Sequence, residues 1–245
     1  MAKLLEIDKV RAGYDAINVL WDISLTAEEG KLTCILGPNG GGKTTLMRAI
    51  MGLIPLRQGA IRFGGKDISN VPTWNLVADG LTMIPEGRMI FRDMTVEDNL
   101  LIGGFTRRCR ANARANLEMA YSTFPRLKER RHQLASSLSG GEAQMLAMGR
   151  GLMEEPKLIL VDEPSLGLSP LLTDEVMAIL EQLKAQGRTI ILVEQNTHKA
   201  LKIADHVYLV RGGKVVLSER KEDVDMDRLH DLYFARDVAA NRQDA

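Results

Sequence analysis

The sequence predicts an α/β fold whose core is a mainly parallel sheet, and three observations support this prediction. Short, continuous apolar runs occupy residues 32–36, 158–161, 190–193 and 207–210, and such runs are typical of strands buried on both faces. Residues 172–183 carry apolar side chains at the spacing of one helical face. This helix lies between two of the runs, and a strand–helix–strand order predicts parallel strands joined by a crossover.

Further short segments predict strands outside this parallel core. Residues 207–210 and 214–217 flank Gly212 and Gly213, a pattern typical of a hairpin. Shorter segments with more alternation lie at 4–10, 23–25 and 59–63. We expect these segments and the hairpin to form an antiparallel set that leans against the parallel core.

Two other regions predict helices. Residues 94–135 lack buried-strand runs, and the stretch at 143–153 has a helical pattern. The chain after residue 218 is charged, and a short helix is expected at 227–234. No internal repeat or low-complexity segment interrupts this order.

Composition and charge exclude several classes of protein. Of 245 residues, 45% are hydrophobic and 26% charged, close to the average for soluble globular proteins. The 32 basic side chains balance the 32 acidic ones, so the chain lacks the positive excess of a general nucleic-acid coat protein, and we expect no nucleic-acid partner. No run approaches the roughly 18 apolar residues of a membrane span, and the first residues do not resemble a secretory signal. The two cysteines, Cys34 and Cys109, are too few for a disulfide framework and fit a cytosolic chain.

The segment after the first buried run predicts a phosphate-binding loop. It matches the pattern G-x-x-x-x-G-K-[ST] between a strand and a helix. Its glycines let backbone N–H groups turn toward a phosphate, and the following helix adds a favourable dipole. The lysine of this motif reaches the β- and γ-phosphates, and the first threonine coordinates Mg²⁺. The expected nucleotide-binding residues are Gly37, Pro38, Asn39, Gly40, Gly41, Gly42, Lys43, Thr44 and Thr45.

Two acids directly follow the second buried run. Asp162 comes at the carboxyl end of that strand, where a phosphate-binding fold needs another Mg²⁺ ligand. Glu163 is placed to polarise a water in line with the γ-phosphate. The alternative is that the two acids cap a helix whose first turn holds Pro164.

A second helix start has the features of an anion-binding site. Ser139 is a natural N-cap, and Gly140 and Gly141 expose backbone N–H groups just before the 143–153 stretch. By itself this pattern is equally typical of an ordinary helix cap.

Taken together, the phosphate-binding loop, the segment 138–142 and the segment 158–164 resemble the nucleotide-binding subunit of ATP-binding cassette (ABC) transporters, over about residues 4–216. The resemblance implies an ATPase in which two subunits sandwich two ATP molecules. Ser139, Gly140 and Gly141 would then hold the γ-phosphate of ATP bound to the partner subunit. Tyr14 matches the position whose ring stacks on adenine, although an ordinary aromatic at a strand end gives the same pattern.

The resemblance also implies how the chain is divided. We expect a P-loop NTPase core with an antiparallel β subdomain and an α-helical subdomain, forming a single ATPase domain over residues 4–236. The helical subdomain, about 94–150, carries the segment with Ser139 and is inserted in the catalytic core. Residues 237–245 form a charged tail.

Three positions depart from the common family pattern. Glu86 stands where a glutamine usually faces Mg²⁺, Ser169 replaces an aspartate, and Gln195 replaces the switch histidine. Gln195 can donate a hydrogen bond to a γ-phosphate oxygen but cannot carry a proton there, and His198 is not assigned that role. The expected metal ligands are Thr44, Glu86 and Asp162, and the expected catalytic residues are Glu163, Lys43 and Gln195.

The departures indicate either a weakened ATPase or a subfamily, and we favour the subfamily. The segments 85–88, 163–170 and 193–196 resemble the smaller ATPase subunit of branched-chain amino-acid import systems. The ATPases of urea and short-chain amide importers are the nearest alternative, but they more often keep glutamine at the position of Glu86. A regulatory module that binds ATP without hydrolysing it is the other alternative.

An apolar segment after Glu86 predicts a docking site. In the family, the groove at this place receives a short helix of a membrane subunit, and adaptable methionines suit such a socket. The alternative is that these side chains pack under the helical subdomain. The residues are Met89, Ile90, Phe91, Met94 and Val96.

The resemblance also implies the remaining partners. We expect a related, non-identical second ATPase subunit, with a homodimer as the alternative for the isolated chain, two permease subunits docked near residues 89–94, and indirect contact with a solute-binding protein. Such a complex places this chain peripherally on the cytoplasmic face of the inner membrane. A GTP-binding switch lacks support because the sequence has no Asn-Lys-x-Asp motif. The segment 138–142 has no role in a small-molecule kinase. Soluble proteins with ATP-binding cassettes are typically longer than this chain.

Overall fold

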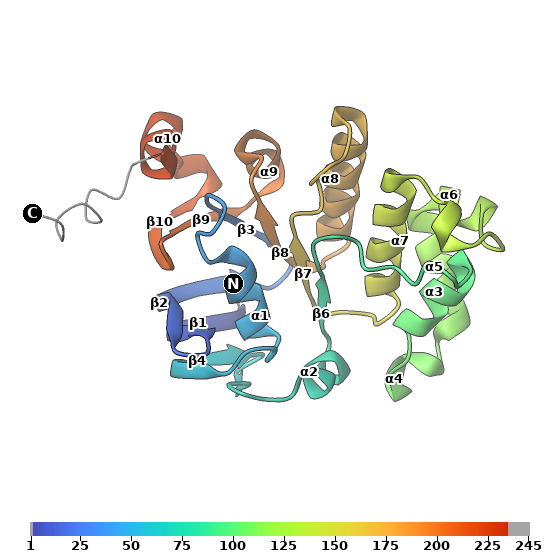
Figure 1. The fold of residues 1–245 in the computed structure, drawn as a ribbon, viewed down its shortest axis with the longest axis horizontal. Helices are drawn as coiled ribbons and strands as arrows, with labels where there is room; N and C mark the ends of the chain where they lie inside the picture. The colour runs from blue at the N-terminus through green and yellow to red at the C-terminus, as the bar shows by residue number, and fades with distance from the viewer. Residues whose placement is uncertain (1, 235–245) are drawn as a thin grey trace, which may run out of the picture.

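The computed structural model describes residues 2–234, whose strands form two sheets (Figure 1). The larger sheet has the order β10-β9-β3-β8-β7-β6. Neighbouring strands from β9 to β6 pair in parallel, and β10 is antiparallel to β9. Its strands are β3 (Leu32–Leu36), β6 (Leu81–Ile84), β7 (Leu158–Asp162), β8 (Thr189–Glu194), β9 (His206–Arg211) and β10 (Lys214–Arg220). The predicted mainly parallel core is therefore confirmed.

The smaller sheet is antiparallel and has the order β2-β1-β4-β5. Its strands are β1 (Lys3–Tyr14), β2 (Ile17–Glu28), β4 (Leu56–Phe63) and β5 (Lys66–Asp67). This sheet confirms the antiparallel set apart from the hairpin at 207–217, which belongs to the core sheet, as the buried run at 207–210 predicts. Strand β9 pairs in parallel with β3 because Val207–Val210 are buried on both faces, so the hairpin extends the core sheet.

The core sheet is covered on both faces, which explains why its strands lack alternation. Cys34, Val161 and Leu192 belong to a cluster that includes side chains of α7, α8 and α9. Ile35, Leu160 and Ile191 belong to the opposite cluster, which includes α1 and the antiparallel sheet. The helices are α1 (Lys43–Ile50), α2 (Thr73–Asp79), α7 (Gly140–Leu152), α8 (Pro170–Ala185), α9 (Thr197–Ile203) and α10 (Met226–Phe234).

Four further helices gather with α7 at one end of the molecule (Figure 1). They are α3 (Val96–Gly103), α4 (Arg107–Arg110), α5 (Ala113–Thr123) and α6 (Pro125–Glu129), and a short 3₁₀ turn (Ala135–Ser137) precedes α7. Another 3₁₀ turn (Lys221–Asp223) precedes α10. The helices expected at 94–135 and 227–234 are confirmed. The predicted tail at 237–245 lies outside the described residues, and no helix within 2–234 has the length and apolar character to cross a membrane.

Candidate nucleotide-binding site

The predicted phosphate-binding loop joins β3 to α1 at the carboxyl edge of the core sheet. Gly37 and Gly42 have positive φ angles of 154° and 106°, which L side chains rarely adopt. A Cβ atom at Gly37 would lie 2.1 Å from the carbonyl oxygen of Val210. The loop therefore packs directly against the end of β9, and only glycine fits at its first position.

The side chain of Lys43 is held by three acceptors although it is almost fully buried. Its Nζ donates to the carbonyl oxygens of Gly37, at 2.8 Å, and Pro38, at 3.1 Å. It also lies 3.3 Å from Oε1 of Glu163. The loop and the end of β7 are thus joined through one ammonium group.

Asp162 ends β7 with its carboxylate in an unusual environment. The residue is 1% exposed, and neither carboxylate oxygen has a hydrogen-bond partner within residues 2–234. Burial, together with the nearby carboxylates of Glu163 and Glu86, raises the pKa of Asp162 to about 6. A buried carboxylate without a partner is costly, and a cation would relieve that cost.

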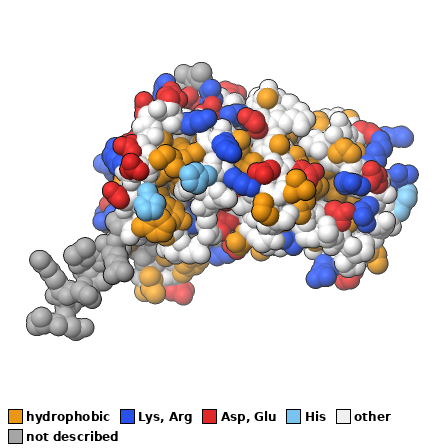
Figure 2. Space-filling view, turned by 90° about the horizontal axis from the view of Figure 1, so that it is seen from above, with side chains coloured by type: hydrophobic (Ala, Val, Ile, Leu, Met, Phe, Trp, Pro, Cys, Tyr) orange, Lys and Arg blue, Asp and Glu red, His pale blue; other side chains and the backbone are white. Residues whose placement is uncertain are grey.

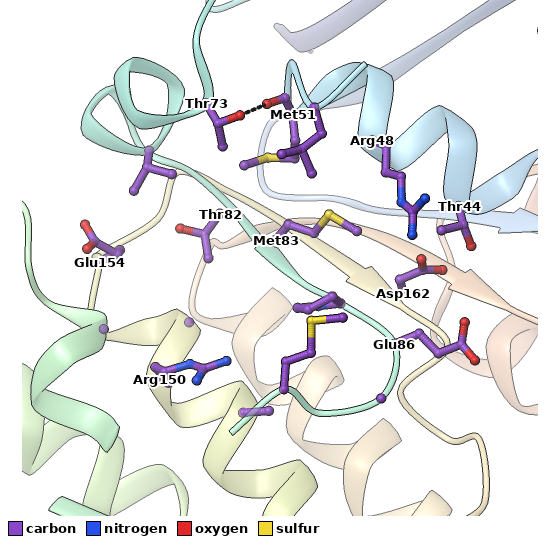
Figure 3. Close-up of a pocket in the computed structure, with 18 of the residues that line it drawn as sticks. Thr44, Arg48, Met51, Thr73, Thr82, Met83, Glu86, Arg150, Glu154 and Asp162 are labelled. Carbon is purple, nitrogen blue, oxygen red and sulfur yellow. Dashed lines mark hydrogen bonds between the residues drawn. The ribbon is translucent and has the colours of Figure 1, made fainter. Parts of the chain in front are cut away.

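Two more oxygen donors line the cavity that contains Asp162. Thr44 and Glu86 both line it and lie near Asp162 (Figure 3). One hydroxyl and two carboxylates form an oxygen donor set of the kind that Mg²⁺ prefers. The three predicted metal ligands are therefore brought together, and the orphaned oxygens of Asp162 show that they fit a hard divalent cation.

Glu163 and Gln195 form a direct contact. The amide Nε2 of Gln195 donates to Oε2 of Glu163, across the edge between β7 and β8. Glu163 has a φ angle of 47°, a backbone conformation that is unfavourable for a non-glycine residue and is typical of functional sites. Its side chain faces the phosphate-binding loop.

The alternative interpretation of the two acids as a helix cap is wrong. Helix α8 begins only at Pro170, and Ser169 is its N-cap, with its Oγ accepting from the N–H of Leu172 at 3.4 Å. Ser169, at the position where the family usually has aspartate, therefore stabilises a helix start.

A cavity of about 390 Å³ collects most of the predicted phosphate-site residues. The sequence analysis did not single out Val19 and Leu166, which also line it, because isolated apolar residues carry no local signal of a site. His198 does not line this cavity and lies beside α10 instead. The predicted residues around it are Asn39, Gly40, Gly42, Lys43, Thr44, Thr45, Glu86, Glu163 and Gln195.

Ser139 starts α7 with a complete capping box. Its Oγ accepts from the N–H of Glu142 at 3.3 Å, and its own N–H donates to Glu142 Oε2 at 2.9 Å. Arg130 Nε lies 2.8 Å from Glu142 Oε1 and orients the same carboxylate. A Cβ atom at Gly141 would lie 2.7 Å from the side chain of Leu172, so this helix start packs closely on α8. Within one chain these residues do not line the phosphate cavity.

Tyr14 lies at the end of β1 and is 38% exposed. Its hydroxyl accepts a hydrogen bond from Nη1 of Arg48 at 3.1 Å. The ring is therefore held near α1 while the residue stays partly exposed to solvent, and its stacking on a base stays a prediction.

A cleft of about 740 Å³ runs from Asp162 and Thr44 toward helices α3 and α7 (Figure 3). Met89 and Phe91 line it and are 64% and 48% exposed. Ile90 is partly buried against the core, Met94 is half-buried, and Val96 is fully buried. Val96 therefore follows the alternative of packing under the helical subdomain, because it starts α3 with its side chain in the core.

Asn99, which the sequence analysis missed, shapes this apolar segment. Its fully buried side chain accepts from the N–H of Phe91 at 2.8 Å and donates to the Phe91 carbonyl at 2.9 Å. The guanidinium of Arg150 lies 5.3 Å from the centre of the Phe91 ring, and its Nη1 is buried without a hydrogen-bond partner among residues 2–234. The cleft thus presents fixed apolar side chains beside one unsatisfied donor.

Comparison with known proteins decides the family. The ABC transporter family matches residues 20–166. The chain belongs to the ABC transporter family. The high-affinity branched-chain amino acid transport ATP-binding protein BraG of Pseudomonas aeruginosa is 41% identical over 88% of this chain and 92% of its own. The probable branched-chain amino acid transport ATP-binding protein LivF of Archaeoglobus fulgidus is 33% identical over 88% and 91%.

Solved ABC cassettes have the same fold as this one. The ADP conformation of an ATP-binding cassette of an ABC transporter superposes with a TM-score of 0.81, at 26% identity and 95% coverage of both chains. A nucleotide-free cassette gives a TM-score of 0.77 at 28% identity, covering 89% of this chain and 92% of its own. The predicted P-loop NTPase core with an antiparallel and a helical part is confirmed, and the chain, as an ABC ATPase, binds nucleotide.

Proposed function

We propose that this ABC ATPase is the ATP-hydrolysing subunit of a membrane importer for branched-chain amino acids. The observation that carries the proposal is the cluster of Lys43, Glu163 and Gln195 beside the orphaned carboxylate of Asp162. The identity of 41% to BraG supports the choice of cargo.

ATP binds with its phosphates in the loop between β3 and α1. The loop N–H groups and Lys43 neutralise the β- and γ-phosphates, and the ring of Tyr14 stacks on adenine. Thr44, Asp162 and Glu86 would hold Mg²⁺, which would neutralise charge on the phosphate oxygens. The orphaned oxygens of Asp162 support this assignment.

Glu163 orients or deprotonates the attacking water. In the structure its Oε1 faces Lys43 and its Oε2 faces Gln195, and the contact with Gln195 remains to orient the carboxylate when Lys43 turns to a phosphate. Gln195 in turn reaches toward the γ-phosphate as a hydrogen-bond donor. Positioning and electrostatics account for most of the acceleration in phosphoryl transfer, and these contacts supply both.

A second ATPase subunit completes each site. Residues 4–236 act as one domain, and the helical subdomain at about 94–150 presents Ser139, Gly140 and Gly141 to the nucleotide of the partner. The start of α7 supports this, because Ser139 and Gly140 are exposed there and the helix dipole favours an anion. The partner in the importer is a related, non-identical chain, and a homodimer forms in isolation.

Two permease subunits dock in the cleft near Met89, Ile90, Phe91 and Met94. The exposed apolar side chains support this surface. The cleft also contains Glu86 and Asp162, so an occupant of the cleft acts directly on the metal residues. The chain is held in this way at the cytoplasmic face of the membrane, and a solute-binding protein contacts it only through the permeases.

The proposal is tested by purifying the tagged chain from membranes and identifying the proteins bound to it. The purified complex is then reconstituted in liposomes, and ATP is supplied on the side of the membrane that carries the ATPase subunits. We expect two permeases, a second ATPase and ATP-dependent uptake of leucine, with no uptake in a matched Glu163→Gln complex. Uptake of urea or short-chain amides instead of leucine contradicts the cargo, and recovery without any permease contradicts the transport function.

A further inference from the structure

Helix α10, the last described element, is anchored to the core beside β9 (Figure 1). Leu229 is 2% exposed, and Leu232 and Tyr233 pack against the main hydrophobic cluster. Nη1 of Arg211, at the end of β9, donates to the carbonyl of Leu232 at 2.7 Å. These contacts fix the end of α10 at the carboxyl edge of the core sheet, next to the phosphate-binding loop.

Tyr233 contacts that loop directly. Its hydroxyl donates to the carbonyl oxygen of Gly37 at 3.4 Å, although the two residues are 196 positions apart in the chain. The same carbonyl accepts from Nζ of Lys43 at 2.8 Å. One buried carbonyl of the loop therefore has two donors, a charged one from the loop lysine and a neutral one from α10.

Two further observations place Tyr233 in the catalytic neighbourhood. Burial and the carboxylate of Glu163 raise the pKa of Tyr233, so the phenol stays protonated and remains a donor at neutral pH. A cavity of about 380 Å³ is lined by Tyr233 and His198 together with Gln195, the partner of Glu163. Figure 2 views the molecule from this side, where hydrophobic and histidine side chains lie next to one another.

We propose that Tyr233 is a positioning residue for the phosphate-binding loop. When Lys43 turns to a bound phosphate, as the proposed function requires, the Gly37 carbonyl loses its charged donor. A buried carbonyl without a partner is unfavourable, and the hydroxyl of Tyr233 keeps this one satisfied. The C-terminal helix thus lowers the cost of redirecting Lys43 and raises the affinity for ATP, without touching the nucleotide.

The test compares equilibrium binding of ATP to the full chain and to Tyr233→Phe. This variant keeps the ring and its packing and removes only the hydroxyl. We expect the Kd for ATP to rise roughly two- to tenfold, the effect of one neutral hydrogen bond. The KM of the ATPase should rise similarly, with kcat at saturating ATP within about twofold and an unchanged Tm.

Phe234→Ala is the matched control, because Phe234 is on the same helix, is 64% exposed and makes a ring contact with Tyr233. It should leave the Kd for ATP unchanged. An unchanged Kd in Tyr233→Phe overturns the proposal, and so does an equal rise in both variants, which would assign the effect to helix packing. A rise in Kd caused by a lower Tm also overturns it. If the wild-type chain bound no ATP, the proposed function would fail, a result distinct from these.

Discussion

Nζ of Lys43 and Oε1 of Glu163 lie 3.3 Å apart, and both side chains are almost fully buried. The ion pair joins the phosphate-binding loop to the end of β7, two segments that are far apart in the sequence. The triphosphate is proposed to bind the same ammonium group, so ATP binding would break the ion pair between Lys43 and Glu163. The carboxylate that is proposed to act on water is released from Lys43 only when a phosphate takes its place.

Replacing Glu163 by Gln should lower ATP turnover by roughly 100-fold or more, the scale of lost general-base catalysis. Binding of ATP should survive, because the amide is nearly isosteric and Lys43 keeps its two carbonyl acceptors. Turnover is measured with the assembled complex, and binding with the isolated chain. Glu175→Gln, an exposed substitution on α8, is the control and should behave as the wild type. Turnover near the wild-type level in Glu163→Gln would remove this residue from the base role.

Replacing Gln195 by Ala should reduce turnover only in part. The variant removes the hydrogen bond that orients Glu163 but leaves the carboxylate itself in place to act on water. We expect a loss smaller than that of Glu163→Gln, measured as kcat in the same complex. A complete loss, equal to that of Glu163→Gln, would show that Gln195 does more than sense the γ-phosphate and orient the carboxylate.

Much of the fold and of the phosphate site follows from local sequence patterns. The run before Asp162 is apolar without interruption because both faces of its strand are covered, so the strand and the acid at its end are both predictable. The loop around Lys43 is predictable for a similar reason, since its glycines and its lysine have fixed spacing. In both cases the signal lies within a few residues of the feature that it predicts.

Features that depend on distant pairing were not predictable. The apolar run at 207–210 predicts a strand buried on both faces, but nothing local says that its parallel neighbour is β3. The contact between Tyr233 and Gly37 joins opposite ends of the chain. Burial also separates apolar neighbours that look alike in the sequence, because Val96 enters the core while Phe91 stays exposed.

Replacing Asp162 by Asn should stabilise the chain in EDTA while lowering its Mg²⁺-dependent ATPase activity. The folded-state pKa is raised from 3.8 to about 6, so the fold disfavours the charged carboxylate. The wild type is therefore relatively most stable below about pH 4 and loses stability as pH rises through 6, by about 3 kcal/mol at most. Urea unfolding should show that the free energy of unfolding of Asp162→Asn exceeds that of the wild type by an amount that grows as pH rises from about 4 to about 6. A variant less stable than the wild type at pH 7.5 would contradict it.

Ser139 offers a way to separate the helix cap from the proposed contact with the partner's nucleotide. Ser139→Asp keeps an N-cap acceptor and suits the helix dipole, so the free energy of unfolding should change little. Ser139→Ala loses the capping box and should cost about 1 kcal/mol. Both should lower turnover in the dimer, and Asp more strongly, because its charge repels a triphosphate. If activity followed stability across the two variants, Ser139 would be only a cap.

If permeases dock in the cleft as proposed, a variant of its exposed apolar residues should lose membrane association without losing ATP binding. Met89→Ala combined with Phe91→Ala removes two exposed apolar side chains, so the isolated chain should keep its Tm and its Kd for ATP. Recovery of permeases with the tagged chain should fall severalfold, because large exposed apolar side chains act as anchors in interfaces. Leu134→Ala, at an exposed apolar residue outside the lining of the cleft, is the matched control and should leave recovery unchanged. Wild-type recovery in the double variant would place the permease contact elsewhere on the surface, and the continuity between this cleft and Asp162 would then have no role in coupling.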